Sequence, residues 1–248
     1  MKAANNEVSV VTCCMGRENF LFSSLKNWLK FEAISEIIIV DWSCSEEIYN
    51  NEIILNSDKI KVIRVNGMNR WILSWAYNLG ISLSNNKSVL KLDCDISLGF
   101  SFFDNYKLNQ NIFFRGSWEV AREENEHHLN GQFFCHKKHL EDVNFFNERI
   151  LSYGWDDDDL YYRLKSLGVK EYFFNPKHIF HSENSNKERV SNQPEFSNVP
   201  ELDLESALKY KIIKNKAFAK SKPWLNNDLK KNWSIEKKYK NYWEAKII

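Results

Sequence analysis

The sequence alternates short apolar runs, rich in β-branched residues, with segments of helical periodicity. Between the first two runs, for example, Leu21, Leu25, Trp28 and Leu29 recur on one helical face. This alternation is typical of a mostly parallel sheet with helices on its faces, so we predict an α/β, Rossmann-like domain. The predicted strands are VSVVT (8–12), EIIIVD (36–41), KVIRV (61–65), SVLKLD (88–93), NIFFRG (111–116) and GQFFCH (131–136).

The composition is that of a globular domain with a sizeable core. The chain has 248 residues, of which 43% are hydrophobic. No apolar run approaches the ~20 residues of a membrane-spanning helix, and the first residues, MKAANNEVSV, lack a secretory signal pattern, so we expect a cytoplasmic protein. The five cysteines lack C-x-x-C spacing, which favours reduced thiols over a zinc site.

The charge is divided unevenly along the chain. From Ser206 to the end there are twelve lysines and three acidic residues, a balance of +9 that leaves −8 for the rest. We therefore expect a main domain at 1–200 and a basic, aromatic, helical segment at 201–248. Two interpretations of this segment stay open: a packed appendage, or a surface that docks on an anionic membrane. The acidic remainder argues against nucleic acid as the partner.

Polar residues follow the predicted strands at the edge of the sheet where ligands bind. In an open α/β sheet that edge is formed by the carboxyl ends of the strands, and Thr12, Asp41, Asp93 and Asp95 fall there. The first strand is followed by TCCMGREN, which has neither the dinucleotide fingerprint nor a P-loop. If a nucleotide binds, something other than a glycine-rich turn must hold its phosphates.

Two short motifs contain candidate metal ligands. Asp93 and Asp95 are two apart in an extended chain, so both carboxylates can address one divalent cation. The alternative is a pair of exposed turn aspartates. His178 and His181 in HIFHSEN suit Mn²⁺ or Zn²⁺ and would complete a three-ligand site with Asp95, unless they are surface or capping histidines.

Four consecutive aspartates, Asp156–Asp159, open a predicted helix after an aromatic pair. Helix capping explains one or two of these carboxylates. Asp157 lies in phase with Leu160 and should point toward a cleft, whereas Asp158 should lie on the solvent side. Crowded carboxylates raise one another's pKa, which can tune one of them as a general base.

These motifs, in this order, resemble the GT-A fold nucleotide-sugar glycosyltransferases, most closely the β-1,4-galactosyltransferase and chondroitin-synthase-like group. Asp93-Cys94-Asp95 looks like the family's Asp-x-Asp, and SYGWDDDDL (152–160) is similar to its Gly-Trp-Gly-x-Glu-Asp-x-Asp-Leu motif. VVTCCMGRENFL is similar to its opening strand and basic loop, MNRWILSWAYNLG to its Phe-Asn-Arg segment, and IFHSEN to its closing metal-ligand histidine. The resemblance covers about residues 8–190.

The resemblance implies a metal-dependent, inverting transferase that uses a nucleotide sugar, most simply a UDP-hexose or UDP-N-acetylhexosamine. Rival functions are a metal-dependent phosphodiester hydrolase and a non-catalytic carbohydrate-binding protein. By analogy with the family, the expected roles are Asp157 as the base with Asp156 beside it, Asp95, His178 and His181 as ligands of Mn²⁺ (or Mg²⁺), Thr12, Arg17, Asp41, Arg70 and Asp93 around the nucleotide, and Tyr153, Trp155 and Asp156 around a saccharide or lipid-linked acceptor.

Overall fold

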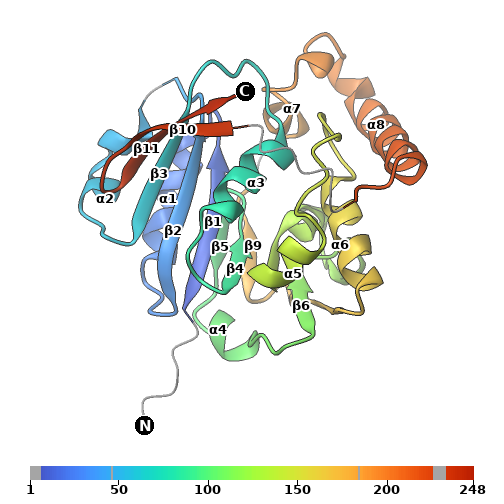
Figure 1. The fold of residues 1–248 in the computed structure, drawn as a ribbon. Coiled ribbons are helices and arrows are strands. Elements are labelled where there is room, and N and C mark those ends of the chain that lie inside the picture. The colour runs from blue at the N-terminus through green and yellow to red at the C-terminus, as the bar shows by residue number, and fades with distance from the viewer. Residues whose placement is uncertain (1–6, 46, 184, 226–232) are drawn as a thin grey trace.

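The chain folds around one large central sheet flanked by helices (Figure 1). The computed structural model describes residues 7–45, 47–183, 185–225 and 233–248. In the order β10-β11-β3-β2-β1-β4-β7-β6-β8, the nine strands of this sheet are Trp233–Lys238, Tyr242–Ile247, Ile60–Val65, Ile34–Trp42, Val8–Cys14, Ser88–Lys91, Phe133–His136, Ile112–Arg115 and Lys170–Phe173.

Most neighbouring strands run parallel, as the sequence predicts. The exceptions are the pairs β4–β7, β6–β7 and β10–β11, which are antiparallel. A separate two-stranded sheet pairs β5 (Ile96–Leu98) with β9 (Ile179–His181) and sets Ile96 opposite His181. All six strands predicted from the sequence are present, with ends that differ by a few residues.

Eight α-helices and four 3-10 helices connect the described strands. The α-helices are α1 (Glu18–Trp28), α2 (Glu52–Leu55), α3 (Leu73–Ser82), α4 (Phe102–Asn105), α5 (Lys137–Asp142), α6 (Asp156–Ser166), α7 (Asn186–Arg189) and α8 (Glu201–Ser221). The 3-10 helices are η1 (Ile48–Asn50), η2 (Trp118–Val120), η3 (Glu124–Gly131) and η4 (Pro194–Phe196). No described helix combines the length and hydropathy that crossing a membrane requires.

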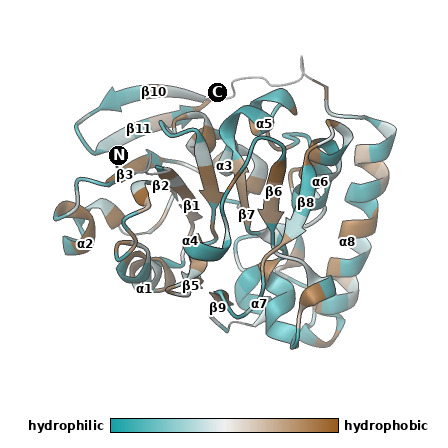
Figure 2. Cartoon of the chain, turned by 90° about the horizontal axis from the view of Figure 1, so that it is seen from below, coloured by the Kyte–Doolittle hydropathy of each residue, from teal (hydrophilic) through white to brown (hydrophobic). Residues whose placement is uncertain are grey.

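Each face of the sheet carries its own hydrophobic core. Along β2, Ile37 and Ile39 belong to the core that includes α1, while Ile38 and Val40 belong to the core that includes α3 and α6. This alternation follows from the two-residue period of a strand, and β2 is apolar on both faces because helices cover both. In Figure 2 the hydrophobic residues concentrate on the central strands, and α8 is mostly hydrophilic.

The C-terminal segment departs from the expected all-helical appendage. Residues 201–221 form α8, but β10 and β11 are strands, and β11 pairs in parallel with β3; residues 226–232 lie outside the described residues. Alternating side chains explain this: Trp243 and Ala245 are buried on one face of β11, a period of two that the lysine-rich composition obscured. The boundary at residue 200 stays a prediction.

Candidate active site

A cleft of about 1290 Å³ opens at the carboxyl ends of β1 and β4. One side is lined by Arg17 after β1 and by Asp93 and Asp95 after β4. The other side includes residues 152–158 at the start of α6 and several residues of α8. The cleft therefore lies where an open α/β sheet binds its ligands, and it brings together the two acidic motifs of the sequence.

A buried lysine links these two motifs. Lys91 is fully buried at the end of β4, and its Nζ lies 2.9 Å from Oδ1 of Asp93 and 3.8 Å from Oδ1 of Asp157. The same ammonium group lies 4.5 Å from the centre of the Tyr77 ring. Burial alone would lower the pKa of Lys91, but Asp93 and Asp157 outweigh it and raise the pKa above its ordinary value. Lys91 therefore keeps its charge and joins the strand to the first turn of α6.

Asp93 is held in one orientation. The Tyr77 hydroxyl donates to its Oδ1 at 2.8 Å, and Nε2 of Gln132 donates to its Oδ2 at 2.6 Å. The backbone N–H of Asp93 donates in turn to Oε1 of Gln132 at 2.8 Å. Burial would raise the pKa of Asp93, but Lys91 and Gln132 hold it well below its usual range. Asp93 is thus a fixed anion at the cleft surface.

Asp95 and His181 meet at the same edge because β5 pairs with β9. Asp95 is buried, with Oδ2 2.9 Å from Nη1 of Arg17 and 3.4 Å from Nε2 of His181. Burial would raise the pKa of Asp95, but His181 and Arg17 lower it. The two predicted metal ligands Asp95 and His181 are therefore neighbours, and Arg17 shares the carboxylate.

Asn125 of η3 fixes the tautomer of His181. Nδ2 of Asn125 donates to the backbone carbonyl of His181 at 2.8 Å, so its Oδ1 must be the atom that lies 2.7 Å from Nδ1 of His181. That oxygen can only accept, so Nδ1 carries a proton. Nε2 then donates to Asp95 when the ring is charged and presents a lone pair when the ring is neutral. In the neutral form Nε2 and Oδ2 of Asp95, 3.4 Å apart, are two acceptor atoms that can share a cation.

His178 does not reach this place, contrary to our expectation of a third ligand. Its Nδ1 lies 3.0 Å from the Tyr106 hydroxyl, and the two rings pack edge to face. His178 precedes β9 and lies three residues before His181, and extended residues three apart project to opposite sides. Among the described residues, no group of three or more His, Cys, Asp or Glu side chains is placed to hold a metal ion. The described chain supplies two donors here.

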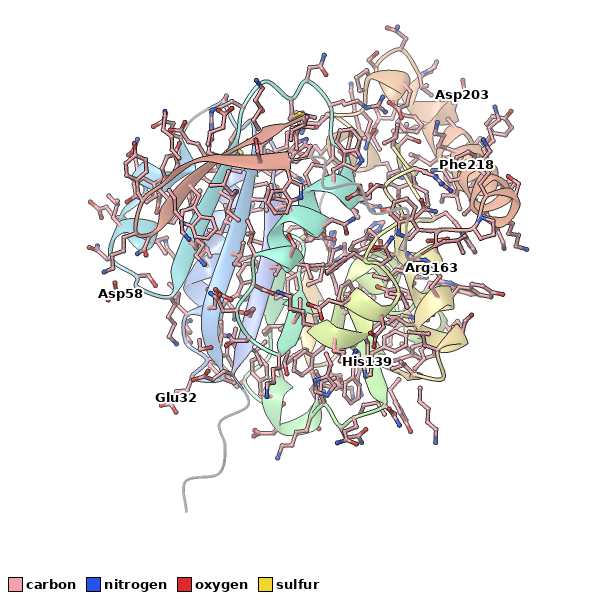
Figure 3. The ribbon with its side chains drawn as sticks, in the orientation of Figure 1. Glu32, Asp58, His139, Arg163, Asp203 and Phe218 are labelled. Atoms are coloured by element: carbon pink, nitrogen blue, oxygen red, sulfur yellow. The ribbon has the colours of Figure 1, made fainter. Side chains whose placement is uncertain are left out.

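The acidic run occupies the first turn of α6. Asp156 and Asp159 are buried, and Asp159 pairs with Arg163 at 2.9 Å (Arg163 is labelled in Figure 3). Asp157 and Asp158 are half-buried and both line the cleft, so the prediction that Asp158 lies on the solvent side is wrong. The cleft extends around the N-terminal end of α6, so its lining includes Asp156 and Asp158, the residues on both sides of Asp157.

Asp157 has the least satisfied carboxylate of the run. No described residue donates a hydrogen bond to its Oδ1, whose ion-pair partner Lys91 is 3.8 Å away. Burial raises the pKa of Asp157 well above its usual value; Asp156 and Asp93 add to the shift and Lys91 opposes it. Burial likewise raises the pKa of Asp156 to about 6. Both carboxyl groups therefore hold a proton more tightly than an exposed aspartate does.

Gly131 makes the close approach of these charges possible. A Cβ at this position would lie 3.1 Å from Oδ2 of Asp157, 3.2 Å from Nζ of Lys91 and 3.4 Å from Oδ2 of Asp93. Any larger side chain would push apart three charged groups that have little room to move. The backbone of Gly131 thus forms one wall of the charge cluster.

Tyr153 and Trp155 line the cleft beside Asp157. Gly154 and Trp155 both have left-handed backbone conformations, with φ of +90° and +71°, which turn the chain sharply into α6. A cation accompanies each ring: Arg189 lies 6.0 Å from the centre of Tyr153, and Lys216 lies 4.4 Å from that of Trp155. The aromatic side chains therefore form part of the cleft wall, and their contact with an acceptor stays a prediction.

Three residues predicted to bind the nucleotide are not in the cleft lining. Asp41 is buried against Arg64, 2.6 Å away, and accepts a hydrogen bond from the backbone of Cys44. Thr12 is buried inside β1, and Arg70 donates to the carbonyl of Leu151 at 2.9 Å. Their contact with a nucleotide stays a prediction.

Four residues of the site were missed by sequence reasoning. Lys91 had a usable signal, because it stands two residues before Asp93 in an apolar strand and shares the side of Asp93 and Asp95. His128, whose ring lies 5.0 Å from that of His181, has its pKa lowered to about 3 by burial and by Arg189, so it is a neutral imidazole. Asn125 and Gln132 are distant in sequence from their partners and had no signal.

Comparison with known proteins shows likeness in structure alone. No protein-family model and no curated sequence matches the chain. Two structures of Drosophila β1,4-galactosyltransferase 7 align over 98% of this chain and 94% of theirs, one a mutant with manganese, UDP-Gal and xylobiose (TM-score 0.62, 10% identity), the other a catalytic domain with xylobiose (TM-score 0.61, 9% identity).

A third similar structure is the mannosyltransferase PcManGT from Pyrobaculum calidifontis with GDP-Man and Mn²⁺. It covers 88% of this chain and 76% of its own, with a TM-score of 0.59 and 12% identity. Together these likenesses show that the chain has the GT-A fold.

Proposed function

We propose that the protein is a metal-dependent, inverting glycosyltransferase that moves a hexose or N-acetylhexosamine from a UDP-sugar to a saccharide or lipid-linked acceptor. The observation that supports this most is the presence, in one cleft, of Asp157 with an oxygen free of hydrogen bonds from described residues and of the Asp95–His181 pair. A base and a cation site on a shared cleft are what an inverting transfer requires.

The Asp95–His181 pair fits a divalent cation, Mn²⁺ or Mg²⁺. The lone pair on Nε2 of His181 and the carboxylate of Asp95 are a mixed nitrogen and oxygen donor set, which suits Mn²⁺ well. When bound, the ion would neutralise the diphosphate leaving group. The galactosyltransferase and the mannosyltransferase above were crystallised with manganese and a nucleotide sugar. His178 stays outside this ligand set.

The donor would lie along the sheet side of the cleft. Of the residues predicted to bind it, Arg17 and Asp93 line the cleft, and we propose them as direct contacts with the diphosphate and the ribose. Arg17 brings a positive charge beside Asp95, where a glycine-rich phosphate loop is missing.

Asp157 would act on the acceptor from the helix side. Its Oδ1 takes the proton of the attacking acceptor hydroxyl while the hydroxyl oxygen bonds to the anomeric carbon. The bond between the sugar and the phosphate breaks, and its electrons stay on the diphosphate. The raised pKa of Asp157 increases its basicity, which helps it to accept this proton. Tyr153, Trp155 and Asp156 would hold the acceptor ring beside it.

A donor panel tests this function. The protein is incubated with UDP- and GDP-linked hexoses and N-acetylhexosamines, with Mn²⁺ and with a chelator. Metal-dependent release of a nucleoside diphosphate from one donor supports a transferase. Release of the monophosphate indicates a phosphodiester hydrolase, and binding without turnover indicates a carbohydrate-binding protein.

We also propose that α8 contacts an anionic membrane when the acceptor is lipid-linked. Its outward side exposes Leu202, Tyr210 and Ile213 among lysines such as Lys214 and Lys220. The tryptophans of the segment take no part, because Trp224, Trp233 and Trp243 are all buried in the protein.

A further inference from the structure

One face of α8 packs against the loop 152–155, which carries residues proposed to bind the acceptor. Three α8 residues at i, i+3 and i+4 face this loop, namely Ile212, Asn215 and Lys216. Residues with this spacing share one helical face. The basic C-terminal segment thus forms part of the cleft wall, although these three residues lie 57 residues or more beyond Trp155 in the sequence.

Asn215 makes the central contact. Its Nδ2 lies 3.4, 3.0 and 2.8 Å from the carbonyl oxygens of Ser152, Tyr153 and Gly154. Three consecutive carbonyls converge on one amide, and each carries a partial negative charge. Without a donor these oxygens would repel one another and turn apart, so Asn215 determines the path of the loop.

The contacts on either side leave the loop little freedom. A Cβ on Gly154 would lie 2.4 Å from Cγ1 of Ile212, so only glycine lets the helix approach this closely. Lys216 covers the ring of Trp155 at 4.4 Å. Asp157 follows two residues later, so the position of its carboxylate depends on the same turn.

We propose that Asn215 is a positioning residue that fixes the acceptor-binding loop and, through it, Asp157. This inference rests on the proposed function. Asn215 itself touches neither the metal pair nor the donor side, so its loss should affect the acceptor and the proton transfer and spare donor binding. A misplacement of about 1 Å at a reacting group is enough to cost roughly 10²-fold in rate.

The test compares Asn215→Ala with Ser206→Ala, an exposed residue on the opposite face of α8. Alanine is a better helix former than asparagine, so Asn215→Ala does not weaken α8 itself. We expect KM for the acceptor to rise about tenfold and kcat to fall about 10- to 100-fold, with the donor Kd within twofold. Ser206→Ala should match the wild type.

Two further variants separate positioning from loss of folding. Asn215→Gln keeps the amide and should retain more activity than Asn215→Ala, whereas Asn215→Asp sets a carboxylate against three carbonyls and should be the worst. Hydrogen exchange of the peptide 152–160 should quicken in Asn215→Ala and stay unchanged in Ser206→Ala.

An active wild type together with an Asn215→Ala variant that has unchanged acceptor KM, kcat and exchange would overturn the inference and leave the proposed function standing. A wild type that turns over no nucleotide sugar would overturn the proposed function instead.

Discussion

Asp157 is subject to two opposing influences on its charge. Burial and the carboxylates of Asp156 and Asp93 favour its protonated form, and Lys91 favours the ionised form. Lys91 is fully buried and lies close to both Asp93 and Asp157. Its charge therefore favours the ionised form of Asp157, but it does not pair with Asp157 alone. A carboxylate held in this balance is suited to take a proton and give it up again.

We predict that Asp157→Asn lowers kcat about 10² to 10⁴-fold with donor binding nearly unchanged, because it keeps the shape and removes the basicity. Since the pKa of Asp157 is raised and the base must be ionised, the wild-type rate should increase with pH through a midpoint above the ordinary ~4 of a carboxyl group, and the variant should lack this limb.

Asp158→Asn is the neighbouring control for this assignment. Asp158 also lines the cleft, but it already has a hydrogen bond with Asn130, so we expect a loss at least tenfold smaller. Equal losses in the two variants would show that the base is assigned wrongly.

The metal pair provides a second residue-level prediction. His181→Ala should abolish tight Mn²⁺ binding, and Asn125→Ala should weaken it about 10- to 100-fold, because the partner that fixes the imidazole tautomer is lost. His178→Ala is the control, since this ring bonds to Tyr106 instead. Binding is measured directly, by titration followed with Mn²⁺ paramagnetic resonance. A drop in affinity for His178→Ala as large as that for His181→Ala would contradict the assignment.

The sequence predicted the charged residues of the site better than their partners. Asp93, Asp95, His181 and Asp157 stand in motifs whose spacing reflects a strand end or a helix start, so a local pattern was enough to find them. The prediction that His178 is a metal ligand is wrong because residues three apart share a face in a helix, whereas the chain at His181 is extended. Asn125, Gln132 and Asn215 act through contacts between distant segments, which no local pattern encodes.

At the scale of elements, α6 begins without a side-chain cap. Its N-cap residue is Trp155, in the left-handed region, and no side chain of that residue bonds the free N–H groups. The four aspartates of the first turn stabilise the positive end of the helix dipole instead. The turn that directs the start of α6 toward the cleft therefore depends on Gly154 and on the packing of α8 against this residue.

We predict that Gly154→Ala destabilises this turn, because φ of +90° is strained for alanine and the new Cβ would overlap Ile212. The free energy of unfolding should fall by about 1–3 kcal/mol, measured by urea denaturation. Combining it with Ile212→Ala removes the overlap and leaves the backbone strain, so the double variant should be more stable than the sum of the two single changes. If the changes in unfolding free energy of the two single variants simply add in the double variant, Ile212 of α8 does not contact the new side chain at position 154.

Strands and helices with a clear period were predictable, and the last two strands were not. The β1, β2 and β3 runs are apolar on both faces, which distinguishes them from loops. In β11, Glu244 and Lys246 alternate with buried Trp243 and Ala245, a pattern that the total charge conceals. The pairing of β11 with β3 is a long-range contact and lay beyond any local signal.

For the whole molecule, the uneven charge suggests an orientation at a surface. Clustered lysines near anionic lipid contribute ~1 kcal/mol each, so we predict that the protein sediments with anionic liposomes at low salt and not with neutral ones. Lys214→Glu with Lys220→Glu, on the exposed side of α8, should reduce this binding strongly. Lys138→Glu, an exposed lysine on α5, changes the charge elsewhere and should have little effect. Equal sedimentation with both liposome types would rule the membrane contact out.

The partner of β3 follows it in the sequence by a long interval. Val62 of β3 pairs with Tyr242 of β11, about 180 residues later, so the edge of β3 stays open until β11 has been translated. Helix α8 is also translated after the turn at Gly154, and until it packs there the contacts of Ile212 and Asn215 with this turn are missing. A truncated translation product would thus combine an open strand edge, prone to aggregate, with a loose catalytic loop. We therefore expect a chain that lacks α8 and β11 to aggregate and to lose the loop geometry on which the proposed activity depends.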